Sequence, residues 1–102
     1  MDYSKLSSQE IERLARTIHP GAWAIEPERP LATLLGSCVA VCLFDPHARV
    51  GGLNHFMLPN IRRSSNDDVD TLLSGSYAME SLLNALLMKG AKKIRLQAKA
   101  FG

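Results

Sequence analysis

The chain has 102 residues, of which 46% are hydrophobic and 22% charged, and these values are typical of one soluble globular domain. Its net charge of +2, from 12 basic and 10 acidic side chains, is too small to indicate a nucleic-acid-binding surface. The longest uncharged stretch, residues 31–44, is shorter than the roughly 20 apolar residues of a membrane-spanning helix. We therefore expect one domain over residues 1–102, without nucleic-acid binding or membrane insertion.

Two elements are predicted in the first thirty residues. Ser7 and Glu10 form the S-x-x-E pattern of a capping box, and apolar residues follow at helical spacing, which predicts a helix over residues 8–18. Pro20-Gly21 ends this helix. Residues 22–25 then form a short apolar run that is typical of a strand.

A β-hairpin is predicted in the middle of the chain. Residues 31–44 are almost continuously apolar, and a second apolar run covers residues 50–58. Residues 45–48 between them have the composition of a turn. If these four residues form the hairpin loop, Cys38 lies directly opposite His55, with both side chains on one face of the sheet.

The last third of the chain predicts a loop, a helix and a strand. Residues 60–70 are polar and predict an exposed loop. Apolar residues at helical spacing, followed by Gly90, predict a helix over residues 76–89. Residues 93–99 alternate polar and apolar, which predicts a strand that buries one face, made of Ile94, Leu96 and Ala98.

Cys38 and His55 are the strongest candidates for catalytic residues. A thiolate is a nucleophile, and a nearby imidazole can accept the thiol proton, so the pair could perform acyl transfer. Gly36-Ser37 would bend the chain before Cys38, expose its sulfur and direct backbone N–H groups at an oxyanion. A third polar group usually orients such a base, and spacing alone leaves Thr33 and Asn54 as candidates.

The other cysteine and the other histidines are predicted to have no catalytic or metal-binding role. Cys42 lies among apolar strand residues and is assigned to packing. His19 and His47 lie beside prolines of a helix end and a turn, where we expect exposure to solvent. A zinc site built from Cys38, Cys42, His47 and His55 has no usual ligand spacing, so neither a metal nor another cofactor is expected.

The cellular compartment is predicted from the number of cysteines and from the first residues. Two cysteines cannot form the disulfide framework of a small secreted domain, and the first residues lack the pattern of an export signal. A reducing compartment would keep both thiols free. We expect a cytoplasmic protein.

Two motifs resemble those of a known family. Residues 33–45, TLLGSCVAVCLFD, and residues 51–59, GGLNHFMLP, are similar to the CheD family of chemoreceptor glutamine deamidases. Weaker similarity extends to His19-Pro20-Gly21 and to residues 98–102. The resemblance implies an α+β fold of mixed β-sheets packed together and flanked by helices, like the catalytic domain of cytotoxic necrotizing factor.

The resemblance also implies an activity and its residues. Cys38 would be the nucleophile, His55 its general base and Thr33 the third catalytic residue. The reaction would convert glutamines of methyl-accepting chemotaxis receptors to glutamates through a cysteine thioester. A CheC-type phosphatase would be the regulatory partner.

The family domain continues beyond the motif at which this sequence stops, so the resemblance implies that the C-terminal part of the domain is absent. This leaves a second hypothesis, a non-catalytic CheD-like module that binds a CheC-type phosphatase or a receptor. It also leads us to expect a marginally stable or self-associating chain, because the last strand would have an uncovered edge.

Overall fold

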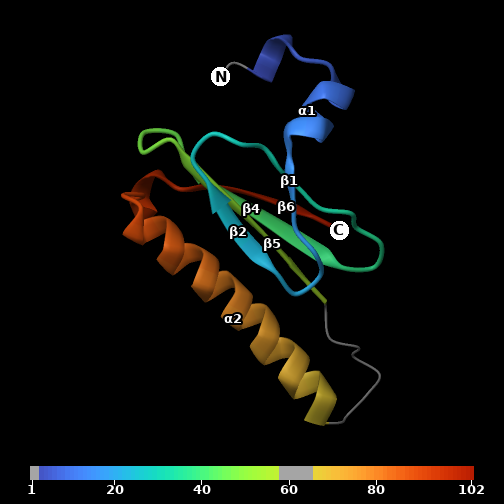
Figure 1. Ribbon diagram of the computed structural model, residues 1–102. Coiled ribbons are helices and arrows are strands. Elements are labelled where there is room, and N and C mark those ends of the chain that lie inside the picture. The colour runs from blue at the N-terminus through green and yellow to red at the C-terminus, as the bar shows by residue number, and fades with distance from the viewer. Residues whose placement is uncertain (1–2, 58–65) are drawn as a thin grey trace.

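The computed structural model describes residues 3–57 and 66–102, with side chains from residue 75 onward in the second range. Figure 1 shows α2 along one side of the strands and α1 on the other. In chain order the elements are a 3₁₀ turn Tyr3–Lys5, α1 Ser8–Leu14, β1 Arg16–Thr17, β2 Trp23–Glu26, β3 Leu31–Ala32, β4 Val39–Asp45, β5 Val50–Phe56, α2 Asn66–Met88, a 3₁₀ turn Lys93–Arg95 and β6 Gln97–Phe101.

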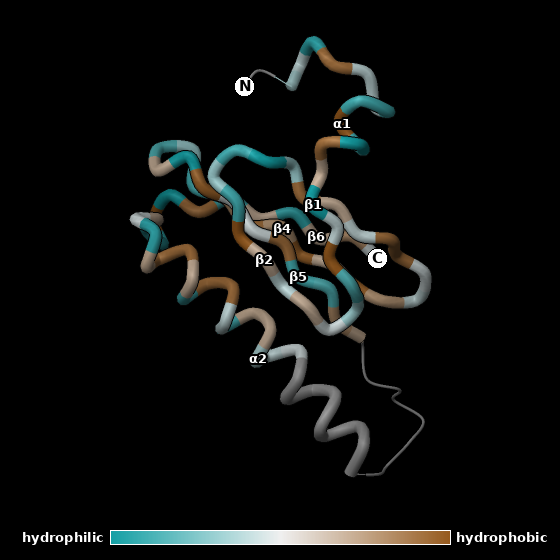
Figure 2. Tube along the Cα trace, in the orientation of Figure 1, coloured by the Kyte–Doolittle hydropathy of each residue, from teal (hydrophilic) through white to brown (hydrophobic). Residues whose placement is uncertain are grey.

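The strands form two sheets. Four of them make an antiparallel sheet in the order β2-β5-β4-β6, and β1 and β3 make a separate parallel pair. The sequence prediction of an α+β fold, with mixed sheets packed together and flanked by helices, is confirmed. Hydrophobic residues run through the central strands, as Figure 2 shows.

The helix α2 covers one face of the four-stranded sheet. Leu82 and Leu86 are fully buried there against Leu43 and Val50. Gly52 of β5 permits this close approach, because a Cβ at this position would overlap Cδ1 of Leu82 and lie 3.0 Å from Cγ2 of Ile25. The main apolar core therefore lies between α2 and the sheet.

The parallel pair β1–β3 packs on the opposite face of the sheet. Ile18 follows β1 and is buried in a second apolar cluster with Ala24, Ala40 and Leu53. Because side chains alternate along a strand, these sheet residues point away from α2. The fold thus has three layers: α2, the four-stranded sheet, and β1–β3.

The first helix is shorter than the sequence predicts. The Ser7–Glu10 capping box is present, but α1 ends at Leu14 and Ala15 is already extended. The amide of Arg16 donates to Pro30 O at 2.8 Å, and that of Ile18 donates to Ala32 O at 2.9 Å. Pairing with β3 therefore replaces the last predicted helical turn. Helical spacing of apolar residues cannot reveal this pairing.

The C-terminal elements also differ from the prediction. α2 begins at Asn66, so the predicted exposed loop over 60–70 is wrong for residues 66–70, and residues 60–65 lie outside the described part. The predicted strand 93–99 is a 3₁₀ turn followed by β6, and its predicted buried face is wrong because Ile94 is 92% exposed. Among the described strands β6 pairs only with β4, at the edge of the sheet, and all its residues are exposed.

The predicted hairpin is confirmed, but its predicted register is wrong by two positions. Asp45 pairs with Val50, and Ala40, not Cys38, lies opposite His55. The loop starts one residue later than predicted because Asp45 remains in β4 and its carbonyl accepts from the Arg49 amide at 2.8 Å. Because the register differs by two residues, each residue within β4 still points to the predicted face of the sheet. Cys38 lies just before β4, so the register does not determine where its side chain points.

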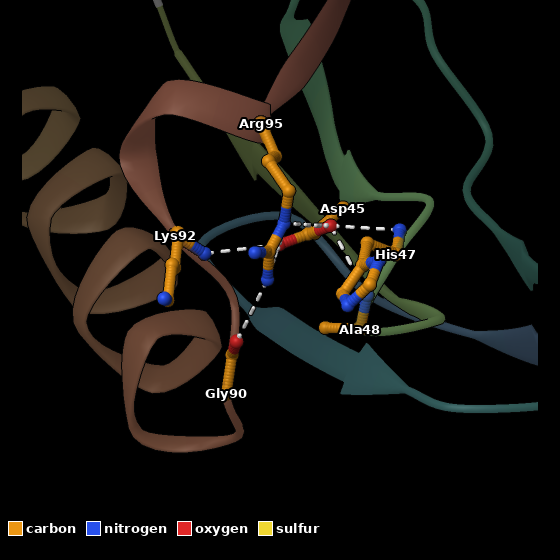
Figure 3. Close-up of polar contacts among 6 residues, drawn as sticks. All are labelled: Asp45, His47, Ala48, Gly90, Lys92 and Arg95. Atoms are coloured by element: carbon orange, nitrogen blue, oxygen red, sulfur yellow. Dashed lines mark hydrogen bonds and ion pairs between the residues drawn. The ribbon is translucent and has the colours of Figure 1, made fainter.

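Asp45 explains why the loop starts there. Its buried carboxylate accepts the backbone amides of His47 and Ala48, 2.9 and 3.1 Å away. It also accepts the Lys92 amide at 2.9 Å and forms an ion pair with Arg95 (Figure 3). The hairpin loop is thereby fastened to the segment between α2 and β6.

The described residues include no helix that is both long enough and apolar enough to span a membrane.

Candidate active site

The candidate site lies on the sheet face opposite α2. His55 is near the end of β5 and is 1% exposed, and its strand neighbour Ala40 is equally buried. Thr33 follows β3 in the layer that packs on this face. Residues from three separate segments therefore surround the imidazole.

A short hydrogen bond joins Thr33 to His55. The hydroxyl oxygen of Thr33 lies 2.7 Å from Nδ1 of His55 and 2.9 Å from the carbonyl oxygen of Ile18. A hydroxyl has one proton, which Thr33 donates to Ile18. At Nδ1 the hydroxyl must therefore accept, and Nδ1 of His55 carries a proton.

This arrangement fixes the imidazole tautomer. With Nδ1 protonated, the neutral ring has its lone pair on Nε2. Nε2 is buried and has no hydrogen-bond partner among the described residues. A buried, unpaired acceptor is costly to a fold, and in a site it is available to take a proton.

Cys38 lies at the bend that leads into β4. Residues 36–38 form this bend, as the Gly36-Ser37 pair predicts, and the Cys38 thiol is free and half-buried. Cys38 precedes Ala40, the residue opposite His55, by two positions. Gly102, after β6, packs beside it, because a Cβ there would lie 3.3 Å from Cys38 O. The thiol makes no hydrogen bond to Nε2 of His55.

Asn54, the other candidate for orienting His55, lies elsewhere. Its Oδ1 accepts the Val41 amide at 2.9 Å, and its Nδ2 lies 3.2 Å from Sδ of Met79 on α2. Asn54 is fully buried on the α2 face of the sheet. Of the two residues that spacing left open, the structure brings Thr33 to the imidazole and keeps Asn54 away from it.

A groove of about 510 Å³ crosses the same sheet face. It is lined by Thr33, Ala40 and Leu53, among others. Thr33 is hydrogen-bonded to His55, Ala40 lies opposite it in β4, and Leu53 precedes it by two positions in β5. Its floor also includes Cys42, and burial raises the pKa of that thiol while the charge of Lys99 opposes the effect. Cys38 is not among the lining residues.

The other histidines take structural positions. The backbone amide of His47 donates to the Asp45 carboxylate in the hairpin loop. The backbone carbonyl of His19 accepts from the Ala22 amide at 3.0 Å and closes a turn. Among the described side chains, those of residues 3–57 and 75–102, no three His, Cys, Asp or Glu residues lie close enough together to hold a metal ion.

Comparison with known proteins gives matches to one family. The sequence model of the family described as "CheD chemotactic sensory transduction" matches residues 57–102. A protein of Dechloromonas aromatica named "Probable chemoreceptor glutamine deamidase CheD 2" is 91% identical over the whole chain. This chain belongs to the CheD family.

Further CheD relatives are more distant. A "Probable chemoreceptor glutamine deamidase CheD 2" of Burkholderia thailandensis is 50% identical over the whole chain, and a "Probable chemoreceptor glutamine deamidase CheD" of Rhizobium rhizogenes is 48% identical over 90% of it. The chain spans about half the length of these relatives: 52% of the first, 53% of the second and 52% of the third.

One group of the candidate site could not be predicted from residue types. Ile18 acts through its backbone carbonyl, which fixes the Thr33 hydroxyl, and a carbonyl leaves no signal in the residue type. The only trace in the sequence is that Ile18 directly precedes His19-Pro20-Gly21, a pattern that by itself predicts the end of a helix.

Proposed function

We propose that this CheD chain is the catalytic region of a cytoplasmic glutamine deamidase that acts on methyl-accepting chemotaxis receptors. Cys38 is the proposed nucleophile, His55 the general base and Thr33 the residue that orients it. The observation that carries the proposal is the Thr33–His55 bond of 2.7 Å, in which Nδ1–H donates to the hydroxyl and the buried Nε2 is left as a free acceptor.

In the first half of the proposed reaction, Nε2 of His55 accepts the Cys38 thiol proton and the sulfur attacks the carbon of a glutamine side-chain amide. A C–S bond forms and the amide oxygen takes the negative charge. The oxyanion then collapses, the C–N bond breaks, and the nitrogen leaves as ammonia with the proton held by His55.

In the second half, water attacks the thioester while Nε2 accepts a proton from it. The C–S bond breaks, the proton returns to the Cys38 sulfur, and the product is glutamate. Thr33 takes part in neither bond change. Its role is to hold the ring in one tautomer, so that Nε2 and not Nδ1 faces the reaction.

Two features support this function. The names of the relatives state chemoreceptor glutamine deamidation, and one of these relatives is 91% identical over the whole chain. The groove lined by Thr33 and Ala40 is a concave, largely apolar surface, as substrate sites usually are, and Thr33 is the hydrogen-bond partner of His55.

A CheC-type phosphatase is the proposed regulatory partner, on the family resemblance alone. Isothermal titration of the purified chain with such a phosphatase tests this directly. Saturable binding supports the partnership, and the absence of heat at concentrations far above those in cells contradicts it.

The deamidase proposal is tested by incubating the protein with a chemoreceptor cytoplasmic fragment and analysing its peptides by mass spectrometry. We expect selected glutamines to become glutamates. Cys38→Ala should abolish conversion, and His55→Ala should lower its rate by about 100-fold or more. Cys42→Ala is the matched control, because its thiol lies four positions along the same strand region and is assigned to packing.

Equal conversion by the wild type and Cys38→Ala would contradict the proposal. Saturable receptor binding without conversion, by a chain whose folding is verified by circular dichroism, would instead favour the non-catalytic module.

A further inference from the structure

The segment before β2 contacts both residues of the Thr33–His55 pair. The Ile18 carbonyl accepts the Thr33 hydroxyl proton at 2.9 Å. The Gly21 amide donates to the His55 carbonyl at 2.8 Å, and the His55 amide donates to the Ala22 carbonyl at 3.1 Å. The side chain and the backbone of the proposed base are thus both tied to residues 18–22.

The pattern of these bonds is that of a β-bulge. In the regular part of the β2–β5 pair, Trp23 lies opposite Asn54, which would place Ala22 opposite His55. Instead, the His55 carbonyl accepts from Gly21 while the His55 amide donates to Ala22. Two residues of one strand therefore oppose the single residue His55, and Gly21 has a φ of +82°. This is the arrangement of a bulge whose first residue is a left-handed glycine.

A tight turn leads into the bulge. The Ala22 amide donates to the His19 carbonyl at 3.0 Å, which closes a four-residue turn over His19–Ala22. Pro20 in the second position and a positive-φ Gly21 in the third are the residues that a type II turn requires. The sequence His19-Pro20-Gly21 therefore specifies the bulge directly.

We infer that the bulge at Gly21-Ala22 is a positioning element for His55: it sets the direction of the imidazole at the end of β5, and Ile18 in the same segment sets the tautomer. Bulges bend a strand and re-aim a side chain, and they recur next to active sites. The inference rests on the proposed function, since it gives His55 the role of base.

Gly21 is the position at which this can be tested. A side chain at Gly21 has space, because a Cβ there would meet no atom of the described residues within 4 Å, and the obstacle is the positive φ. Valine tolerates this conformation poorly and asparagine tolerates it well. Gly21→Val should therefore disturb the bulge, whereas Gly21→Asn should preserve it.

Gly90 offers a matched control. Its φ is +100° and a Cβ there also meets no atom within 4 Å. It follows α2, where its amide donates to Leu87 and its carbonyl accepts from Arg95. Gly90→Val thus introduces the same kind of backbone strain at a position whose hydrogen bonds do not involve the candidate site.

The primary measurement is the nitrogen NMR spectrum of the His55 imidazole in the full chain. In the wild type and in Gly21→Asn we expect a protonated Nδ1 and an unprotonated Nε2. In Gly21→Val the two nitrogens should shift toward a mixture of tautomers, and in Gly90→Val they should not. Wild-type nitrogen shifts in Gly21→Val, or an equal disturbance in Gly90→Val, would overturn the inference.

Kinetics give a second measurement with the receptor fragment as the probe. Gly21→Val should lower kcat by about tenfold to 100-fold with KM nearly unchanged, because small displacements of a reacting group have effects of this size. If no variant deamidates but the imidazole signals change as expected, the proposed function fails and the positioning inference stands.

If Gly21→Val does not fold, the wild type still decides the matter. A scalar coupling across the hydrogen bond from the Gly21 amide to the His55 carbonyl is expected, and its absence would overturn the inference.

Discussion

Arg95 and Asp45 form an ion pair in which Nε of the guanidinium lies 3.1 and 3.0 Å from the two carboxylate oxygens and Nη2 lies 3.0 Å from Oδ2. The Asp45 side chain is completely buried and that of Arg95 is 27% exposed. The pair connects the end of β4 to the turn before β6, and so joins elements about fifty residues apart in the sequence. It also determines where the hairpin loop begins, and hence which residue lies opposite His55.

The ion pair predicts a pH-dependent stability. The Arg95 guanidinium holds the pKa of the Asp45 carboxyl well below its usual range, against the opposing effect of burial, and three backbone amides lower it further. A carboxyl with a lowered pKa in the folded state stabilises fully above its unfolded pKa, about 3.9, and loses this contribution as the pH falls toward its folded pKa. Urea unfolding of the wild type should therefore give a free energy that declines below about pH 5.

Asp45→Asn should lower the free energy of unfolding at pH 7, and its difference from the wild type should shrink as the pH falls to 3. Glu26→Gln is the control, because Glu26 forms an ion pair with the half-exposed Arg16 and should change stability little. A constant difference between the wild type and Asp45→Asn across this pH range would show that Asp45 does not act through its charge.

Gly52 should tolerate no side chain. Gly52→Ala places a methyl group where Cδ1 of Leu82 already lies and 3.1 Å from the Ala24 carbonyl oxygen, so either the buried Leu82 side chain or α2 must shift. Overpacking of this kind costs about 1–3 kcal/mol of unfolding free energy. Gly36→Ala, in open space with an ordinary φ, serves as the control for stability alone. Equal unfolding midpoints for the two variants would contradict the packing described for α2.

Thr33 should act through its hydroxyl. Thr33→Val leaves Nδ1–H of His55 without its acceptor, and an unsatisfied buried donor costs about 1–3 kcal/mol, which corresponds to about fivefold to 150-fold in rate. Thr33→Ser retains the hydroxyl and should restore most of the wild-type kcat. The comparison is made with the receptor fragment at saturating concentration. A serine variant as slow as the valine variant would indicate that Thr33 contributes packing and not a hydrogen bond.

Elements that depend on residues close together in the sequence were predicted better than elements that depend on distant partners. The capping box at Ser7 and the hairpin across residues 45–50 were predicted because their signals lie within a few residues. The end of α1 and the hairpin register were not, since the first depends on pairing with β3 and the second on the distant Arg95. Long-range partners leave no periodic pattern in a single sequence.

The same distinction applies to the candidate site. Thr33 and Asn54 could not be separated by spacing, because the choice depends on which sheet face each side chain occupies once β3 folds over β5. The family resemblance favoured Thr33, and the contact with His55 gives that choice a physical reason. The role of Ile18 is carried by its backbone carbonyl, which the residue type alone does not reveal.

The activation of Cys38 by His55 can be tested without a receptor, through the alkylation rate of each cysteine. The chain is treated with iodoacetamide near neutral pH, and labelling of Cys38 and Cys42 is followed by peptide mass spectrometry. Cys42 is an internal control, because burial raises the pKa of its thiol and local unfolding would speed its labelling.

We predict that Cys38 is labelled faster than Cys42 in the wild type, and that His55→Gln slows Cys38 by at least about tenfold while the Cys42 rate is unchanged. The same Cys38 rate in the wild type and in His55→Gln, with Cys42 equally protected in both, would show that His55 does not activate Cys38.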